Sequence, residues 1–424
     1  MPNMTIESAS KNLRAVAANL KARFKNRDKE IDLMCVSAIA GEFMLLIGPR
    51  GEAKTAIVDA FSKCVTGARH FEEGLSKTST IDQILGGVDV PALSSQGVFR
   101  RNTAGYLPEC ETFLLDEGFK APSDLLNALL RVLSERRYQN TPTPTLFGVL
   151  ASNEYPSELR RATNGVPTDL GPHEDSMLPF MDRFFYCSEV TSLPKGGDDW
   201  CSVVFDGCAN ADDGARVSVD ELRFLQNAVK AVKIGQAAKE MIVRTAAGLD
   251  AGEIDGKRVV VSTRRWVKAT GVAKAHALYR GGQTVKPRDL LDLEFALWTT
   301  PDQRGTVSQM LRLALPPSTG EGIVVVEEIE ARAAHLRAGR LIYDTASKSY
   351  EVMPSPVSPS HEGFSLAATA LDTAARRATR NLSQAQAAAE DDEDRAEIAA
   401  AIARLAKVTE EITVIAHKAA KAAR

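Results

Sequence analysis

The chain has 424 residues, of which 44% are hydrophobic and 25% charged, and its net charge at pH 7 is −3. This balance predicts a globular protein of about two or three domains, and it disfavours nucleic acid as a partner because nucleic-acid-binding domains usually carry a basic face. No run approaches the roughly 18 consecutive apolar residues of a membrane span, and residues 1–20 lack the apolar core of a signal peptide. We therefore expect a cytoplasmic protein without membrane insertion.

Six cysteines are scattered along the chain without a C-x-x-C pair, which argues against a zinc site and against a disulfide framework. We expect reduced thiols, mostly in the core. They are Cys35, Cys64, Cys110, Cys187, Cys201 and Cys208.

The first strong signal follows a predicted helix over residues 5–24. The apolar run Phe43–Ile47 is typical of a buried parallel strand, and it ends in a glycine-containing turn that leads to Lys54 and Thr55. A phosphate-binding loop needs backbone N–H groups that surround a triphosphate, a lysine that reaches the β- and γ-phosphates, and a hydroxyl that binds Mg²⁺. Ala53 replaces the second glycine of the usual pattern. The predicted nucleotide-binding residues are Gly48, Pro49, Arg50, Gly51, Glu52, Ala53, Lys54, Thr55 and Ala56. Taken alone, this segment could also be a chance glycine-rich turn.

The polar, glycine-punctuated stretch over residues 73–108 is either a hairpin or loop insertion or a plain surface loop. Beyond it, Thr112–Glu117 predicts a short buried strand that ends in two carboxylates. At that place Asp116 would act on Mg²⁺, and Glu117 would polarise or deprotonate the attacking water. The alternative is a pair of solvated turn residues. A helix with one leucine-rich face is expected over residues 123–136.

A further strand is predicted over Leu146–Ala151. Asn153, just after it, is a candidate sensor of the γ-phosphate, although asparagine is also a common turn residue. Arg183 begins the next apolar run and is either a salt-bridged structural arginine or an arginine finger for a neighbouring subunit's site.

The composition changes over residues 191–215, where the α/β domain is expected to end. A capping box at Ser218–Glu221 predicts a helix to about Gly248, followed by helical blocks over 262–278 and 287–300. Together they predict a helical lid. Arg264, near the start of the second block, could reach the γ-phosphate or could be an ordinary surface arginine.

The region after residue 301 has a different character. The β-branched run Ile323–Ile329 and a hairpin pattern over 340–352 predict β structure, and a proline-rich linker follows over 353–360. Two apolar stripes with spacings of three and four then predict a helical hairpin or short coiled coil. The stripes are Phe364, Ala368, Leu371, Ala375, Ala378 and Leu382, then Ile398, Ile402, Leu405, Ile412 and Ile415.

These motifs, in this order, make residues 5–300 resemble the MoxR family of AAA+ ATPases, especially its RavA-like branch. The segments that carry the resemblance are Gly105-Tyr-Leu-Pro-Glu, Phe113-Leu-Leu-Asp-Glu, Leu126-Asn-Ala-Leu-Leu, Ser134-Glu-Arg-Arg-Tyr, Ala151-Ser-Asn-Glu and Val261-Ser-Thr-Arg-Arg-Trp. The resemblance implies an α/β core with a parallel sheet and a phosphate loop, then a helical lid. We expect the core over 1–192, the lid over 193–302, a β-containing segment with its linker over 303–360, and an alanine-rich helical hairpin over 361–424.

The resemblance also implies ATP and Mg²⁺ as ligands, with Lys54 and Thr55 in Walker A and Asp116 and Glu117 in Walker B. Asn153 would be sensor 1, Arg183 the arginine finger and Arg264 sensor 2, and residues 84–105 would hold an insertion that lines a ring pore. It further implies a hexameric homo-oligomer that remodels a protein client, often beside a partner with a von Willebrand factor A domain. Arg50 and Glu52 depart from the small or apolar residues frequent in relatives, and the loop 160–179 before Arg183 looks longer than usual. The alternative function is a nucleotide-gated scaffold with slow turnover that recruits a partner through its C-terminal helices.

Overall fold

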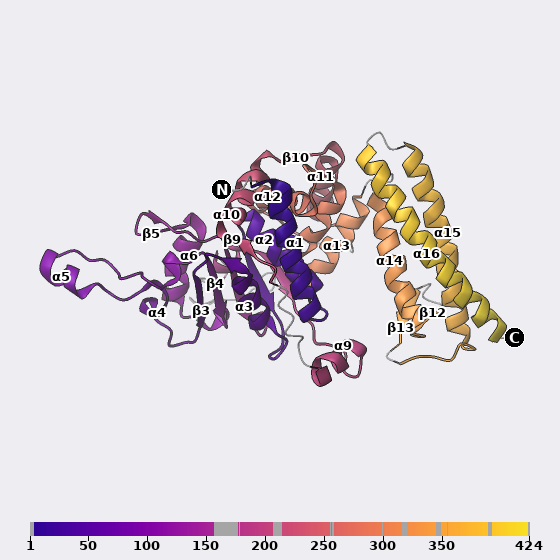
Figure 1. Cartoon of the computed structure of the whole chain (residues 1–424), viewed down its shortest axis with the longest axis horizontal. Helices are drawn as coiled ribbons and strands as arrows, with labels where there is room; N and C mark the ends of the chain where they lie inside the picture. Colours follow the sequence, from indigo (N-terminus) through magenta and orange to yellow (C-terminus); the bar gives the residue numbers. More distant parts are fainter. Residues whose placement is uncertain are drawn as a thin grey trace. The chain divides into compact units, whose positions relative to one another are not determined.

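The computed structural model describes residues 4–156, 177, 179–206, 214–254, 256, 258–298, 300–315, 320–344, 349–353, 355–388 and 392–422. The chain divides into two compact units, Met1–Leu311 and Arg312–Arg424 (Figure 1). The expected loop 160–179 lies largely outside the described residues.

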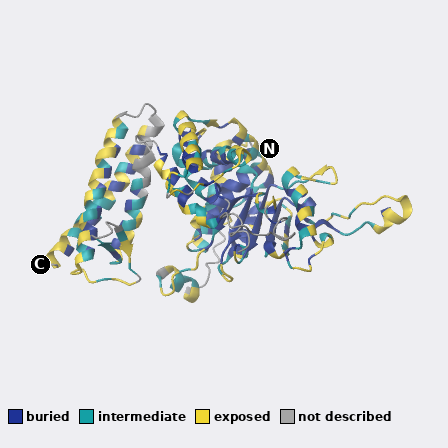
Figure 2. Ribbon diagram, turned by 180° about the vertical axis from the view of Figure 1, so that it is seen from behind, coloured by how far each residue is buried: buried dark blue, intermediate teal, exposed yellow. Residues whose placement is uncertain are grey.

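A parallel five-stranded sheet forms the centre of the first unit. In space its strands run in the order β3, β4, β7, β1, β8. Their bounds are β1 Phe43–Ile47, β3 His70–Gly74, β4 Thr112–Asp116, β7 Phe147–Ser152 and β8 Phe184–Glu189. The inner strands are apolar runs because helices cover both faces of a parallel sheet, and Figure 2 shows them largely buried. Asp116, at the end of β4, is partly exposed. The sequence predicted β1, β4 and β7. It missed β3, which is a polar edge strand with only Phe71 buried.

Among the described residues, four longer helices precede or follow the strands of this sheet along the chain. They are α1 Ile6–Arg23, α2 Asp28–Ala40, α3 Lys54–Cys64 and α6 Ser123–Glu135. Helix α2 packs against β1 and β8, and α3 packs against β4 and β7. The predicted helices at residues 5–24 and 123–136 are confirmed, whereas α2, which is buried along most of its length, carried no amphipathic signal.

Residues 81–105 form an insertion rather than a plain surface loop. It contains two short helices, α4 Ile81–Leu85 and α5 Val90–Gln96, and Val88, before α5, pairs with Arg101 on the chain that returns after α5. Helix α5 lies at the end of this extension, away from the sheet, and is largely exposed (Figures 1 and 2). Smaller elements of the first unit are β2 Val65–Thr66, η1 Leu107–Glu109, η2 Gly118–Lys120, β5 Arg137–Tyr138, β6 Thr141–Pro142, α9 Asp198–Cys201, η3 Ser202–Asp206 and β9 Val217–Ser218.

The rest of the first unit is mainly helical. Its elements are α10 Val219–Ala228, η4 Val229–Ala231, β10 Lys233–Ile234, α11 Gln236–Ala251, α12 Thr263–Arg280, β11 Thr284–Val285, η5 Pro287–Phe295, η6 Pro301–Gln303 and α13 Arg304–Leu313. The capping box at Ser218 is present, but the single helix predicted to Gly248 is wrong. The segment instead forms two helices, α10 and α11, because β10 between them pairs with β11 and Gly235 then caps the start of α11. The block at 287–300 is a 3₁₀ helix that ends at Phe295.

In the part of the second unit that the structure describes, there are three long helices and one hairpin. Its elements are α14 Gly320–Arg337, β12 Leu341–Asp344, β13 Ser349–Val352, α15 Glu362–Ala388 and α16 Asp392–Ala422. The hairpin and the two terminal helices are confirmed. The β structure expected over Ile323–Ile329 is wrong, because this run lies in α14. There Val326, Ile329, Ala333 and Leu336 recur at helical spacing and join the apolar core shared with α15 and α16.

The predicted fold class is therefore confirmed: a parallel α/β core, a helical lid, and a C-terminal region with a small β element and a helical hairpin. None of the helices in the described part of the chain combines the length and apolarity of a membrane span.

Candidate nucleotide-binding site

The carboxyl ends of three neighbouring strands bring the predicted site residues together. β7 lies between β1 and β4, and all three run in the same direction. The loop after β1, the acidic pair at the end of β4 and Asn153 after β7 therefore share one edge of the sheet, which is where α/β folds usually bind ligands.

The loop over residues 48–53 has the backbone of a tight phosphate cradle. A Cβ at Gly48 would lie 2.4 Å from the carbonyl oxygen of Val190, so only glycine fits there. Gly51 has φ +82° and Ala53 has φ +61°. The left-handed conformation costs a non-glycine residue about 1–2 kcal/mol. Ala53 therefore adds little volume where the usual pattern has glycine, but its backbone conformation is strained.

Lys54 begins helix α3 directly after this loop. Its Nζ donates to the carbonyl oxygens of Gly48 (2.6 Å) and Pro49 (2.8 Å) and lies 3.4 Å from Oδ1 of Asn153. Burial lowers the pKa of this ammonium group, and the nearby carboxylates of Asp116 and Glu117 oppose the shift. A buried cation with three donors, beside a helix N-terminus, suits a phosphate group.

Thr55 and Asp116 form the second part of the site. The Thr55 hydroxyl donates to Oδ2 of Asp116 at 3.1 Å, and the backbone N–H of Glu117 donates to Oδ1 at 2.8 Å. Hydroxyl and carboxylate oxygens are the ligand types that Mg²⁺ prefers. The pair thus fits the ion that the sequence predicted for it.

Glu117 is held by three neighbouring groups. Its Oε1 accepts a hydrogen bond from Nδ2 of Asn153 and lies 3.9 Å from Nη2 of Arg50, and its Oε2 lies 3.1 Å from Nζ of Lys120. Asn153 thereby contacts both Glu117 and Lys54. Glu117 also has φ +53°, an uncommon value outside glycine that turns the chain sharply after β4. Sequence reasoning missed Lys120, which lies three residues beyond Glu117.

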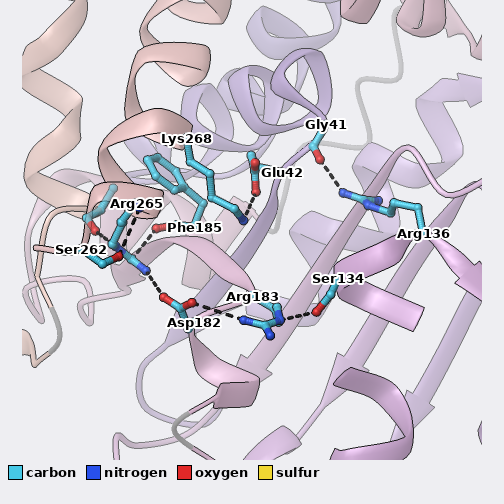
Figure 3. Close-up of polar contacts among 11 residues, drawn as sticks. Gly41, Glu42, Ser134, Arg136, Asp182, Arg183, Phe185, Ser262, Arg265 and Lys268 are labelled. Atoms are coloured by element: carbon cyan, nitrogen blue, oxygen red, sulfur yellow. Dashed lines mark hydrogen bonds and ion pairs between the residues drawn. The ribbon is translucent and has the colours of Figure 1, made fainter. Parts of the chain in front are cut away.

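The two predicted arginines lie apart from this cluster. Arg183 donates through Nε to the Ser134 hydroxyl, and its Nη1 lies 3.3 Å from the Asp182 carboxylate (Figure 3). Arg264 is exposed on α12. Within the described part of the chain, neither makes a hydrogen bond or ion pair with the loop at residues 48–53.

Arg265, the neighbour of Arg264, is the arginine that joins the lid to the sheet. It donates to the backbone carbonyls of Ala296 and, at 2.9 Å, Phe185, and its Nη1 lies 3.3 Å from Asp182. Burial lowers the pKa of its guanidinium group, and the Asp182 carboxylate opposes the shift. Figure 3 shows Asp182 between Arg265 and Arg183, so one carboxylate links the lid arginine to the candidate finger. The sequence offered no way to choose between adjacent arginines.

A second contact ties the same helix to the core. Nζ of Lys268 on α12 lies 2.7 Å from the Glu42 carboxylate, just before β1 (Figure 3). The lid helix is therefore joined to the amino ends of the neighbouring parallel strands β1 and β8.

Comparisons with known proteins indicate the family and the fold. Residues 11–195 match a family model described as the MoxR domain of MoxR–vWA–β-propeller ternary systems, and residues 239–311 match an AAA lid domain. Two uncharacterized proteins of Methanocaldococcus jannaschii are similar. One is 30% identical over 302 residues, which cover 70% of this chain and 74% of that protein. The other is 28% identical over 314 residues, which cover 70% of this chain and 73% of that protein. The crystal structure of a candidate ATPase from Cytophaga hutchinsonii superposes with a TM-score of 0.55 and 18% identity, over 72% of this chain and 95% of that one.

Proposed function

Since the chain belongs to the MoxR family of AAA+ ATPases, we propose that it hydrolyses ATP and couples the cycle to chaperone-like remodelling of a protein client. The observation that carries this proposal is the position of Glu117 beside Asn153 and Lys54 at one edge of the sheet. Membership of the RavA-like branch stays a prediction.

The chain's own residues divide the chemistry as follows. The N–H groups after β1 and the Lys54 ammonium hold the triphosphate, so that its γ-phosphoryl group lies toward Asn153. Glu117 accepts a proton from the attacking water, and Asn153 orients that water or the γ-phosphate. Mg²⁺, when bound by Thr55 and Asp116, would neutralise charge on the phosphate oxygens.

We propose that Arg183 acts as an arginine finger in the site of an adjacent subunit, and that Arg264 contacts the γ-phosphate as the lid closes. An arginine that stabilises charge on the transferred phosphoryl group raises kcat strongly in this class of reaction. Ser134 and Asp182 would hold the Arg183 side chain until an adjacent subunit binds and brings its nucleotide site within reach. This mechanism requires an oligomer, for which we propose a hexameric ring, and the matched family model supports a partner with a von Willebrand factor A domain.

Steady-state ATP hydrolysis per subunit, measured as protein concentration rises, tests the proposal. We expect the specific activity to climb with assembly and to vanish in Glu117→Gln, which keeps the shape of the side chain but removes the base. Lys54→Ala should abolish nucleotide binding as well. Turnover that survives both substitutions would contradict this mechanism.

A second candidate function is a nucleotide-gated scaffold with slow turnover. Three groups contact the Glu117 carboxylate, namely Asn153, Arg50 and Lys120. These contacts favour slow turnover, because they must break before the carboxylate can accept a proton from water. The separate core of Arg312–Arg424 would then recruit the partner. Tight ATP binding with turnover near background at every concentration would favour this candidate over the motor.

A further inference from the structure

Arg27 lies between α1 and α2, outside every motif that the sequence analysis used, yet it contacts the phosphate loop. Its side chain is only 4% exposed. Nη2 donates to Oε2 of Glu52 at 3.0 Å and to the carbonyl oxygen of Thr191 at 2.8 Å, while Nη1 donates to the carbonyl oxygen of Asn26 at 2.7 Å. One guanidinium group therefore joins three segments that are far apart in the sequence.

The phosphate loop and the segment after β8 also contact each other directly. The N–H of Val190 donates to the carbonyl oxygen of Ile47 at 2.6 Å, and Gly48 approaches Val190 too closely for any side chain. The loop thus contacts the end of β8 at its first residue and, through Arg27, at Glu52. Thr191 begins the segment that leaves the sheet after β8.

Glu52 gives the loop a fixed point that its backbone lacks. Gly51 and Ala53 on either side of it have positive φ values, and α3 has no side-chain cap at its N-terminus. An arginine with a planar fork of donors can hold several acceptors in one geometry, which a lysine cannot do. A buried guanidinium group also needs a compensating charge, and Glu52 supplies one.

From these contacts we infer that Arg27 is a positioning residue: through Glu52 it holds the phosphate loop in its binding shape and links that shape to the segment after β8. This inference rests on the proposed nucleotide binding. Without the tether the loop samples other shapes, and apparent affinity falls in proportion to the fraction that stays competent. The chemical step depends on Glu117 and Asn153, which Arg27 does not contact.

Nucleotide affinity and turnover of Glu52→Gln, Arg27→Lys and the double variant test the inference. Binding is measured with a fluorescent ADP analogue, which requires no hydrolysis. Each single variant should raise the Kd about tenfold and leave kcat at saturating ATP within about twofold, and the double variant should be no weaker than the worse single variant, as expected for two residues that act through one contact. Unchanged or tighter binding, or effects that add in the double variant, would overturn it.

Hydrogen exchange separates this role from general loss of stability. In Glu52→Gln the backbone amides of residues 51–56 and 190–192 should exchange faster together, while those of β4 and β7 stay protected. Exchange that rises throughout the sheet would also overturn the inference.

Asp59→Asn is the matched control, because it removes an exposed ion pair with Lys63 on the same helix (2.6 Å) and should leave the Kd unchanged. If the wild-type protein itself fails to bind the ADP analogue, the proposed function fails; if it binds and the variants bind equally well, only this inference fails.

Discussion

Gly48→Ala should destabilise the first unit strongly, because the space beside Gly48 is filled by backbone rather than by a side chain that could rotate away. The new methyl group would lie 2.4 Å from the carbonyl oxygen of Val190 and 3.0 Å from its Cβ. Relief requires β8 to withdraw, which would break the 2.6 Å hydrogen bond from Val190 to Ile47.

The magnitude follows from two costs. Overpacking typically costs about 1–3 kcal/mol, and the lost backbone hydrogen bond adds about 0.5–1.5 kcal/mol. We therefore expect the free energy of unfolding to fall by about 1.5–4.5 kcal/mol. Affinity for nucleotide should fall as well, since the displaced residue is the first of the phosphate loop.

Urea unfolding followed by tryptophan fluorescence is a suitable assay, because the chain's 3 tryptophans, Trp200, Trp266 and Trp298, all belong to the first unit. Gly74→Ala is the control. Gly74 ends strand β3, and a Cβ there meets nothing within 4 Å. Equal urea midpoints for Gly48→Ala and Gly74→Ala, at equal slopes, would refute the reasoning.

Three further substitutions test other parts of the fold. Arg265→Lys should destabilise the first unit by about 1–3 kcal/mol, because two buried carbonyls lose their donor; urea unfolding measures this, and a neutral result would contradict the proposed lid contact. Burial lowers the pKa of His276 from 6.5 despite the Asp292 carboxylate, so the unfolded chain binds a proton that the folded chain does not. The free energy of unfolding should therefore fall below about pH 6.5 by up to about 1.4 kcal/mol per pH unit, and His276→Gln should flatten this slope between pH 7.5 and 5.5. Leu405→Ala should lower the free energy of unfolding of the second unit by about 2–5 kcal/mol, because Leu405 is buried in its core. The backbone amides of that unit should then exchange faster, while the affinity for ADP stays unchanged.

The residues that meet at the candidate site could be picked out from the sequence because each belongs to a local pattern. A buried strand followed by a glycine turn, or by two carboxylates, or by an asparagine, is visible within a few residues. The parallel sheet then brings Lys54, Asp116, Glu117 and Asn153 to one edge. The helical stripes of the C-terminal region were likewise predicted from their spacing, which α15 and α16 confirm.

Several elements escaped prediction because their local composition misleads. The run Ile323–Ile329 contains β-branched residues, yet it is helical because α14 buries one of its faces against α15 and α16. Strand β3 is polar because it lies at the edge of the sheet, where pairing with β4 decides its conformation. In both cases tertiary packing overrides intrinsic propensity.

The amino-acid sequence by itself determined where the phosphate loop, the acidic pair and the asparagine stand, since these depend on neighbours along the chain. Only the tertiary structure decided which acceptors the arginines meet. Arg27 meets Glu52 across 25 residues of chain, and Arg265, not Arg264, joins the lid to Phe185 across 80. A long charged side chain has no periodic pattern to reveal its partner, so its role appears only when folding brings the acceptor within reach of the guanidinium group.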